Sequence, residues 1–328
     1  MPEITDSNNI IKREPVIHVT SSPHILDRGA GTRRIMIDVI IALIPVMLVS
    51  LFFFRLYAVK QIVICTGSCL TAEFIFVRLR GKSITINDFS ATVTGIILAF
   101  SLPPSMPWFA GVIAGFAAIG LGKIIYGGLG MNIFNPAMVG RAFVIMAFTG
   151  ILGADAYSNL SGVADAVSGA TPLAALKYSN IHTALPNMLI GNTPGSIGET
   201  SVLASVTGGL YLILRKAASL EIPLTIIAVI ALISGIVDIT YGHAGLFFYH
   251  NLLGGATMFG AFFIATDPVT SPLTFKGKLC FGIGVGFLTM IMRMYSGYPE
   301  GFMFAILLMN AITPLINRWF IPTPFGGK

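Results

Sequence analysis

A short polar motif stands out in an otherwise apolar chain. Residues 165–171 read Asp-Ala-Val-Ser-Gly-Ala-Thr and are followed by Pro172. Thr171 is predicted to supply a hydroxyl on a flexible, exposed loop, to which a group can be attached, and Gly169 and Ala170 are small enough to let a large molecule approach the backbone. These residue types fit a site that a second enzyme modifies, and they also fit an ordinary loop.

A second candidate site lies in GGLGMNIFNPAMVGRAF, residues 127–143. Asn132 and Asn135 are polar, and Asn135 directly before Pro136 is predicted to cap a helix. Arg141 would lie about one and a half turns into that helix, where a charge needs a partner or must reach the surface. Arg141 therefore either serves a bound anion or an ion path, or extends to the inner membrane surface.

Acidic residues in apolar surroundings are candidates for an ion path. Glu73 lies deep in the run LTAEFIFV, and Asp267 lies in the turn sequence ATDPVTSPLT. Each carboxylate could coordinate Na⁺ or relay a proton, whereas the alternatives are an ion pair of Glu73 with Arg78 or Arg80 and turn capping by Asp267. The acids near the ends of apolar runs are predicted to be surface groups: Glu199, Asp238 and Glu300.

The composition identifies the elements that must position these residues. The chain of 328 residues is 55% hydrophobic and only 10% charged, and its mean hydropathy is +0.83, whereas soluble domains carry about 25% charged residues. We therefore predict an all-α polytopic membrane protein with ten apolar spans. They lie at residues 35–54, 58–77, 89–102, 107–121, 136–150, 200–214, 222–237, 249–265, 278–292 and 301–318.

The Lys and Arg residues predict the orientation of these spans. Most of them bracket the apolar runs on the side that also holds both termini, which is typical of the cytoplasmic side of an inner membrane. The net charge of +6 therefore indicates topology and argues against a nucleic-acid partner. The expected division is a cytoplasmic segment 1–34, a first membrane half 35–150, an extracytoplasmic loop 151–198, a second membrane half 199–320 and a cytoplasmic tail 321–328.

The two membrane halves carry related sequences. TGIILAFSLPPSMP (94–107) and FGAFFIATDPVTSP (259–272) align Gly95 with Gly260 at a constant offset. Because the topology puts the two motifs on opposite sides, we predict two inverted five-helix repeats with broken helices. The alternative is that this pattern of Ser, Thr and Pro is a common way to end a membrane helix.

The motif DAVSGAT resembles the pattern Asp-x-x-Ser/Thr-Gly-Ala-Thr/Ser that flavin transferases recognise when they join FMN through its phosphate to the final hydroxyl. The stretches 127–143 and 265–274 resemble sequences of the RnfD/NqrB family, whose members carry this pattern. From about residue 20 to 320 the chain resembles the D subunit of the Rnf electron-transport complex. It is also similar to the B subunit of the sodium-pumping NADH:quinone reductase, although the short N-terminal region favours Rnf.

This resemblance implies a flavin-carrying subunit of an ion-translocating ferredoxin:NAD⁺ oxidoreductase, which works with other subunits and is not catalytic alone. It implies covalent FMN on Thr171 and a second, noncovalent flavin (riboflavin) among the helices. The attaching enzyme would read the rest of the motif, namely Asp165, Ser168, Gly169 and Ala170. Candidates for the second flavin site are Asn132, Asn135 and Arg141. The coupling ion is Na⁺ or H⁺, and no metal site is predicted.

Two other classes of protein remain open on the residues alone. A channel or secondary transporter would also have inverted repeats and broken helices, and a structural membrane anchor would carry no cofactor. The motif ending at Thr171 argues against both classes, because neither a transporter nor a structural anchor needs a target for a flavin transferase.

Overall fold

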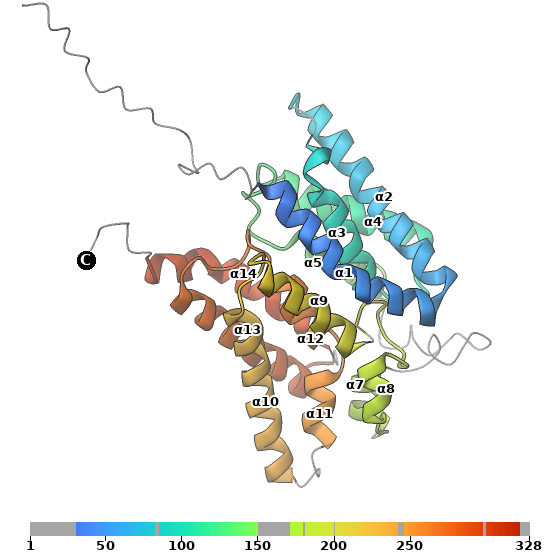
Figure 1. Ribbon diagram of the computed structural model, residues 1–328, viewed down its shortest axis with the longest axis vertical. Helices are drawn as coiled ribbons and strands as arrows, with labels where there is room; N and C mark the ends of the chain where they lie inside the picture. Colours follow the sequence, from blue (N-terminus) through green and yellow to red (C-terminus); the bar gives the residue numbers. More distant parts are fainter. Residues whose placement is uncertain are drawn as a thin grey trace, which may run out of the picture.

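The computed structural model describes residues 31–82, 85–149, 171–179, 181–199, 201–241, 246–297 and 300–321, and these residues form helices and turns without a strand (Figure 1). The longer helices are α1 (Thr32–Phe54), α2 (Leu56–Leu79), α3 (Ser90–Phe100), α4 (Trp108–Ile119), α5 (Pro136–Ala147), α9 (Val202–Leu214), α10 (Glu221–Tyr241), α11 (Leu246–Leu253), α13 (Phe275–Tyr295) and α14 (Phe302–Trp319). The short ones are η1 (Ile86–Asp88), α7 (Pro172–Ala174), α8 (Leu185–Ile190) and α12 (Thr257–Phe259), and the π-helical turns are η2 (Gly120–Ile124), η4 (Ala175–Ser179) and η5 (Gly260–Ile264).

Five of the described helices are long and apolar enough to cross a membrane, namely α1, α2, α10, α13 and α14. A sixth span results if α11 and the α12–η5 helix, which are bent by 48° relative to each other, are taken together. All ten predicted apolar segments coincide with helices. However, α3, α4–η2, α5 and α9 are shorter than a full span, so the prediction of ten spans is not confirmed.

Burial explains the short length of α3. In α3 every residue except Thr92 is buried, and all of η5 is buried. A helix that does not face lipid need not match the thickness of the bilayer, provided that its end groups find partners inside the protein. At the end of α3 the Phe100 carbonyl accepts a hydrogen bond from Gly198 N at 2.8 Å, so this helix can stop within the protein.

The helices form two groups with the same order of contacts. In the first group α2 packs on α3 and α4, and α4 packs on α5; in the second, α10 packs on α11 and α13, and α13 packs on α14. The groups meet where α1 contacts α9 and where α5 contacts α14, and Figure 1 shows them as the blue-to-green and the yellow-to-red parts of the ribbon. This order is the one expected of two five-helix repeats, whose inverted relation remains a prediction.

The two glycines aligned between the halves both lie at close contacts. A Cβ atom at Gly95 would come within 2.5 Å of Thr66 Cα on α2, and one at Gly260 would come within 2.1 Å of the Phe302 ring on α14. Because such distances are impossible for a real side chain, both positions need glycine for packing.

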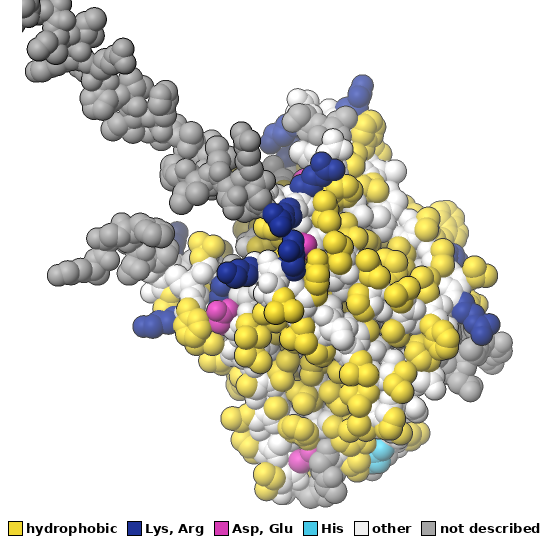
Figure 2. All heavy atoms as spheres, viewed as in Figure 1, with side chains coloured by type: hydrophobic (Ala, Val, Ile, Leu, Met, Phe, Trp, Pro, Cys, Tyr) yellow, Lys and Arg dark blue, Asp and Glu magenta, His cyan; other side chains and the backbone are white. Residues whose placement is uncertain are grey.

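The surface separates charge from apolar side chains. Figure 2 shows Lys and Arg gathered at the end of the molecule where α1 begins and α9 ends, and mostly apolar side chains on the face below them. Exposed apolar residues such as Leu48, Phe52 and Ile239 are suited to contact lipid. The chain is therefore a multi-pass membrane protein by length, composition and surface.

Candidate functional site

Thr171 is the only residue of the polar motif that the structure describes. The other predicted positions lie outside the described residues: Asp165, Ser168, Gly169 and Ala170. Thr171 is the N-cap of α7, and its Oγ1 accepts a hydrogen bond from Ala174 N at 3.3 Å. Its side chain is only 3% exposed, because α7 packs against α11. The expectation of an exposed hydroxyl is therefore wrong for the folded chain.

Thr171 borders a narrow pocket of about 10 Å³ beside the break between α11 and α12. Glu199 and Glu300 contribute two acids to its wall, and Gly254 and Gly255 contribute backbone. Gly255 has φ +60°, so a larger residue would be strained there.

Arg141 holds the two acids of this pocket together. Its Nη1 donates to Glu199 Oε1 and its Nη2 donates to Glu300 Oε2, each at 2.7 Å. The side chains of Arg141 and Glu199 are 6% and 2% exposed, and Glu300 is 17% exposed. Extension of Arg141 to the inner surface is therefore wrong, because the guanidinium is bound on the side of Thr171.

The prediction that the acids near span ends are surface groups is also wrong. Glu199 and Glu300 are bound by Arg141. Asp238 is 7% exposed, and its carboxylate accepts from the backbone N–H groups of Phe247 and Phe248 at the start of α11. Proximity to a span end did not indicate exposure, because neighbouring helices cover these positions.

Replacing Arg141 by methionine should destabilise the protein strongly. The change removes the cation that binds both Glu199 and Glu300, and breaking a buried ion pair in this way costs about 3–5 kcal/mol. Thermal unfolding of the detergent-solubilised protein measures the loss. Arg318→Met is the matched control because Arg318 is exposed, and equal melting temperatures for the two variants would contradict the buried network.

Arg293 satisfies the backbone at the break between α11 and α12. Its Nη1 donates to the Asn251 carbonyl at 2.6 Å, and its Nη2 donates to Thr257 Oγ1 at 2.7 Å. Its Nε donates to the Glu300 carbonyl at 3.2 Å, which connects the break to the Arg141 network. A broken helix within a membrane protein needs such partners.

A larger cleft lies next to the segment that carries Thr171. It has a volume of about 410 Å³ and is lined by Leu173 and Lys177 from the α7–η4 segment, with Tyr241, Phe247 and Tyr295 on its other walls. Volumes of about 300–1,000 Å³ are typical of sites for small molecules, so the cleft has room for a ring system.

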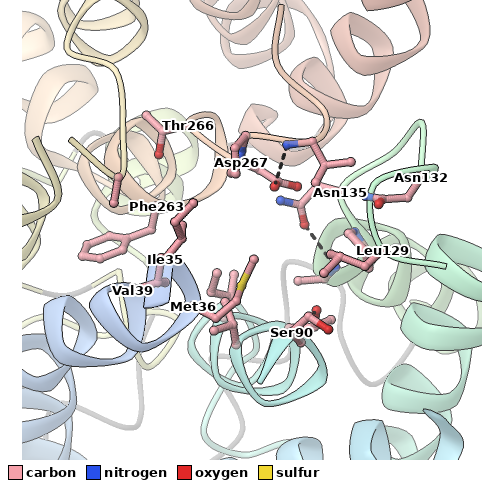
Figure 3. A pocket seen from close by; sticks show the side chains of 18 of the residues that line it. Ile35, Met36, Val39, Ser90, Leu129, Asn132, Asn135, Phe263, Thr266 and Asp267 are labelled. Atoms are coloured by element: carbon pink, nitrogen blue, oxygen red, sulfur yellow. Dashed lines mark hydrogen bonds between the residues drawn. The ribbon is translucent and has the colours of Figure 1, made fainter. Parts of the chain in front are cut away.

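Three of the sequence candidates meet in a separate pocket. Asn132, Asn135 and Asp267 line it together with apolar residues of α1 and η5 (Figure 3). Asn135 caps α5 as predicted, since its Oδ1 accepts from Ala137 N and Met138 N. Asn132 Oδ1 is buried without a hydrogen-bond partner among the described residues. The volume of this pocket is about 70 Å³.

Asp267 occupies the turn that joins η5 to α13. Its Oδ1 accepts from Val269 N at 3.3 Å and its Oδ2 accepts from the Thr270 hydroxyl at 3.2 Å. The alternative of turn capping therefore describes its contacts. Burial raises the pKa of Asp267, and these two hydrogen bonds oppose that effect.

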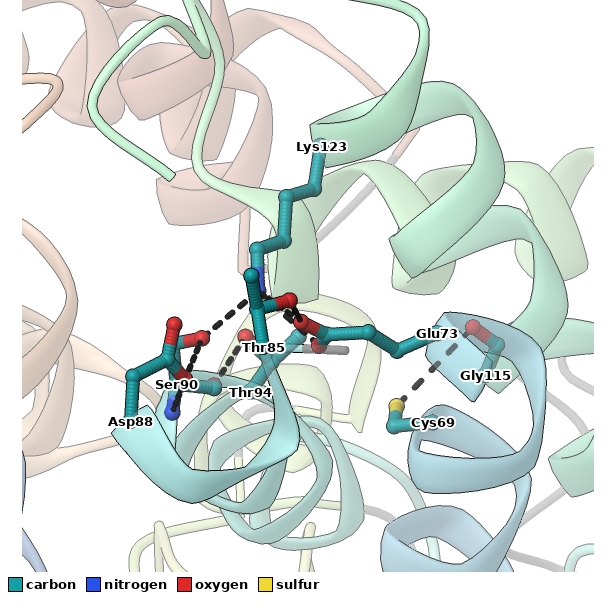
Figure 4. A network of polar contacts seen from close by, with 8 residues as sticks. All are labelled: Cys69, Glu73, Thr85, Asp88, Ser90, Thr94, Gly115 and Lys123. Carbon is teal, nitrogen blue, oxygen red and sulfur yellow. Dashed lines mark hydrogen bonds and ion pairs between the residues drawn. The ribbon is translucent and has the colours of Figure 1, made fainter. Parts of the chain in front are cut away.

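Glu73 is bound in a buried polar network (Figure 4). Lys123 Nζ lies 2.9 Å from both carboxylate oxygens, and the Thr85 hydroxyl donates to Oε1 at 2.6 Å. Lys123 also donates to Ser90 Oγ at 2.6 Å. The described ion pair of Glu73 is thus with Lys123, and not with Arg78 or Arg80, because η2, which carries Lys123, packs against α2, which carries Glu73.

Lys123 links the two inner candidate sites. It pairs with Glu73 and lines the pocket of Asn132, Asn135 and Asp267. The structure therefore brings the predicted ion-path and second-flavin residues together, and separates Arg141 from them. From the sequence alone, Lys123 counts among the basic residues that indicate topology and is not a candidate site residue. Its position inside the apolar run IGLGKIIYGG was the available clue.

Comparison with known proteins identifies the family of this chain. A sequence profile of the NQR2, RnfD, RnfE family matches residues 18–326. The chain belongs to this family. It is 43% identical over 309 residues to the D subunit of the Na⁺-translocating ferredoxin:NAD⁺ oxidoreductase complex of Acetobacterium woodii, with 92% of each chain covered.

Other relatives in the family are D subunits of similar complexes. The chain is 38% identical over 331 residues to the D subunit of the proton-translocating ferredoxin:NAD⁺ oxidoreductase complex of Clostridium ljungdahlii, covering 96% of this chain and 98% of that one. It is 38% identical over 328 residues to the D subunit of the ion-translocating oxidoreductase complex of Halorhodospira halophila, covering 89% and 91%. The resemblance to these D subunits is therefore confirmed along most of the chain.

Proposed function

We propose that the protein is the flavin-carrying membrane subunit of an Rnf-type complex, which couples electron transfer between ferredoxin and NAD⁺ to the translocation of Na⁺ or H⁺. The observation that carries the proposal is similarity to Rnf-type D subunits along most of the chain, combined with a complete DAVSGAT motif ending at Thr171. High coverage of these relatives favours this function over that of the quinone-reductase B subunit. A channel or transporter would leave the motif unexplained.

The first cofactor is FMN, joined by a phosphoester to Thr171. The fit is supported by the hydrogen bonding of the Thr171 hydroxyl, which accepts from Ala174 N and donates none among the described residues. An ester oxygen keeps this acceptor role, so attachment breaks no described hydrogen bond. Because the side chain is buried, the flavin transferase must act before α7 docks or during local opening of this segment.

The cleft next to α7 is the proposed place for the ring of this flavin. Leu173 and Phe247 supply apolar surface, while the exposed Tyr241 and Tyr295 supply aromatic rings. The volume of about 410 Å³ suits a ring system of this size. When bound, the flavin supplies one- and two-electron redox chemistry, and this chain supplies burial and nearby charge.

The second, noncovalent flavin is assigned to the pocket of Asn132, Asn135 and Asp267. Its donor and acceptor groups suit a flavin, because the unpartnered Asn132 Oδ1 can accept the ring N–H. Its volume of about 70 Å³ is below the range usual for such ligands. Binding therefore requires the walls contributed by α1 and the α9–α10 connection to move apart.

The ion path is assigned to Glu73 and Asp267. Lys123 contacts Glu73 and lines the pocket that contains Asp267. An ion or proton that displaced Lys123 from Glu73 would change the charge of the flavin pocket, which provides a route for coupling. We further propose cytoplasmic termini, an extracytoplasmic loop 151–198, and inverted repeats, so that flavins on opposite sides let electrons cross in steps.

A count of bound flavin tests the proposal. Protein co-expressed with a flavin transferase should carry one flavin that survives denaturation and one that is extracted by it. Asn132→Ala should retain the covalent flavin and lose most of the extractable one, since it removes the free acceptor. Asn192→Ala is the control because Asn192 is exposed. Protein without any bound flavin would refute the proposed function.

A further inference from the structure

A basic pocket lies where α2 ends and where the glycine-rich loop after η2 begins. It has a volume of about 230 Å³ and is lined by Arg80 and Lys82 after α2, by Lys123 on η2, and by Gly127 and Gly128 of the loop. Three of the described residues in its wall are basic, and none of those described there is acidic. A concave site lined by one sign of charge attracts ions of the other sign, so this pocket is suited to an anion.

Lys123 adds charge to this wall but no free donor. Its Nζ lies 2.9 Å from both carboxylate oxygens of Glu73 and 2.6 Å from Ser90 Oγ (Figure 4). Because an ammonium group has three N–H donors, these contacts use all of them, and Glu73 balances the charge. The binding of an anion would therefore depend on Arg80 and Lys82.

Arg80 is held in a position that leaves most of its donors available. Its Nη1 donates a hydrogen bond to the Ile124 carbonyl, which fixes the guanidinium against the end of η2. A guanidinium has five N–H donors, and the others have no described partner. Held in this way, it can bind two oxygens of one phosphate group side by side. Lys82 is exposed and supplies a second charge at the same pocket.

The surroundings of the pocket indicate where the anion comes from. Arg80 is the C-cap of α2, one of the helices long enough to cross a membrane, so the pocket lies at the end of a candidate span. Leu79, directly before Arg80, is 77% exposed, and Ile125, directly after Ile124 in the pocket wall, is 60% exposed. Basic groups at a span end beside exposed apolar side chains match a lipid, whose charged headgroup and acyl chains need both.

We propose that this pocket binds the phosphate headgroup of an anionic phospholipid. Arg80 is the principal donor to the phosphate, and Lys82 supplies the second positive charge. The acyl chains lie along the exposed apolar side chains at the ends of α2 and η2. The inference is independent of the proposed redox function, because it requires neither a flavin nor an ion path.

Competition between two lipids tests the inference. Native mass spectrometry of the full chain, released from detergent with equal amounts of phosphatidylglycerol and phosphatidylcholine, counts the lipids bound to each molecule. Both lipids carry the phosphate, but only phosphatidylglycerol has a net negative charge. The wild type should retain phosphatidylglycerol about tenfold or more in preference to phosphatidylcholine, as two basic groups near a lipid headgroup predict.

Two variants and a matched control assign this preference to the pocket. Lys82→Met should weaken binding of phosphatidylglycerol by about fivefold, and it should not impair folding because the side chain is exposed. Arg80→Met should weaken it by about tenfold or more, since it removes charge-assisted hydrogen bonds. Arg78→Met removes the same charge from the same end of α2, but Arg78 is exposed and is not part of the described pocket wall. This control should bind phosphatidylglycerol like wild type.

The melting temperature of the detergent-solubilised chain separates a lipid from a soluble anion. Phosphatidylglycerol at about ten times its Kd should raise the melting temperature of wild type by a few degrees, whereas phosphatidylcholine and inorganic phosphate should not. Equal stabilisation by inorganic phosphate would overturn the assignment to a lipid. Equal retention of the two lipids by wild type would overturn the inference, as would binding of phosphatidylglycerol to Lys82→Met and Arg80→Met as tight as to Arg78→Met.

Discussion

Thr171→Ala is expected to reduce covalent flavin to background, the largest effect of any single substitution in this chain. Alanine lacks the hydroxyl that forms the phosphoester, so no neighbouring group can replace it. The measurement is flavin fluorescence of the denatured protein on a gel after co-expression with a flavin transferase. The noncovalent flavin should remain, because its proposed pocket contains none of the residues around Thr171.

Two control variants separate attachment from folding. Thr171→Ser keeps a hydroxyl at the same position and should remain fluorescent. Thr193→Ala removes a buried threonine that lines the same pocket but lies outside the motif, and it should also remain fluorescent. Fluorescence that persists in Thr171→Ala would move the attachment site elsewhere, and a dark wild-type band would exclude covalent flavin altogether.

Among substitutions of Glu73, Lys123 and Asp267, Lys123→Met is expected to destabilise the protein most. Glu73 is 0% exposed, and without Lys123 its described contacts are reduced to the Thr85 hydroxyl. Removing one partner of a buried ion pair costs about 3–5 kcal/mol, because the other charge stays buried. The melting temperature of the detergent-solubilised protein measures this loss.

The double variant Glu73→Gln with Lys123→Met is the control for this loss. It removes both charges and retains an amide that can accept from Thr85, so it should be more stable than Lys123→Met alone. The difference between the double variant and the sum of the single variants gives the coupling between the two side chains. Additive effects would mean that the pair contributes no specific interaction.

The two acids of the proposed ion path, Glu73 and Asp267, should influence ion coupling. Glu73→Gln and Asp267→Asn preserve side-chain shape, and each should reduce Na⁺- or H⁺-linked activity of the whole complex by about tenfold or more while flavin content stays the same. Asp238→Asn is the matched control, since this buried acid accepts from the backbone of α11 and does not line the pocket of Asn132, Asn135 and Asp267. Unchanged coupling in both test variants would remove these residues from the ion path.

Several features were predictable from local sequence. Long apolar runs require helices in a bilayer, and all ten runs coincide with helices. Asn135 before Pro136 predicted the cap of α5, because capping depends on neighbours two or three residues away. The motif at Thr171 was readable for the same reason, since an attaching enzyme recognises a contiguous stretch. Family membership followed from motifs and overall similarity along the chain.

The partners of the buried charges were decided only by tertiary structure. Glu73 and Lys123 are 50 residues apart in sequence, and Arg141 is 58 and 159 residues from Glu199 and Glu300. Local spacing suggested other outcomes, such as ion pairs between neighbouring residues of one helix or exposure at the surface. The sequence by itself determined that these charges lie near or within apolar helices, where each must be compensated. Which groups compensate them depends on how α2 packs with η2, and how α5 approaches the segments before α9 and α14, because a buried ion pair requires side chains from different helices to meet within a few ångströms.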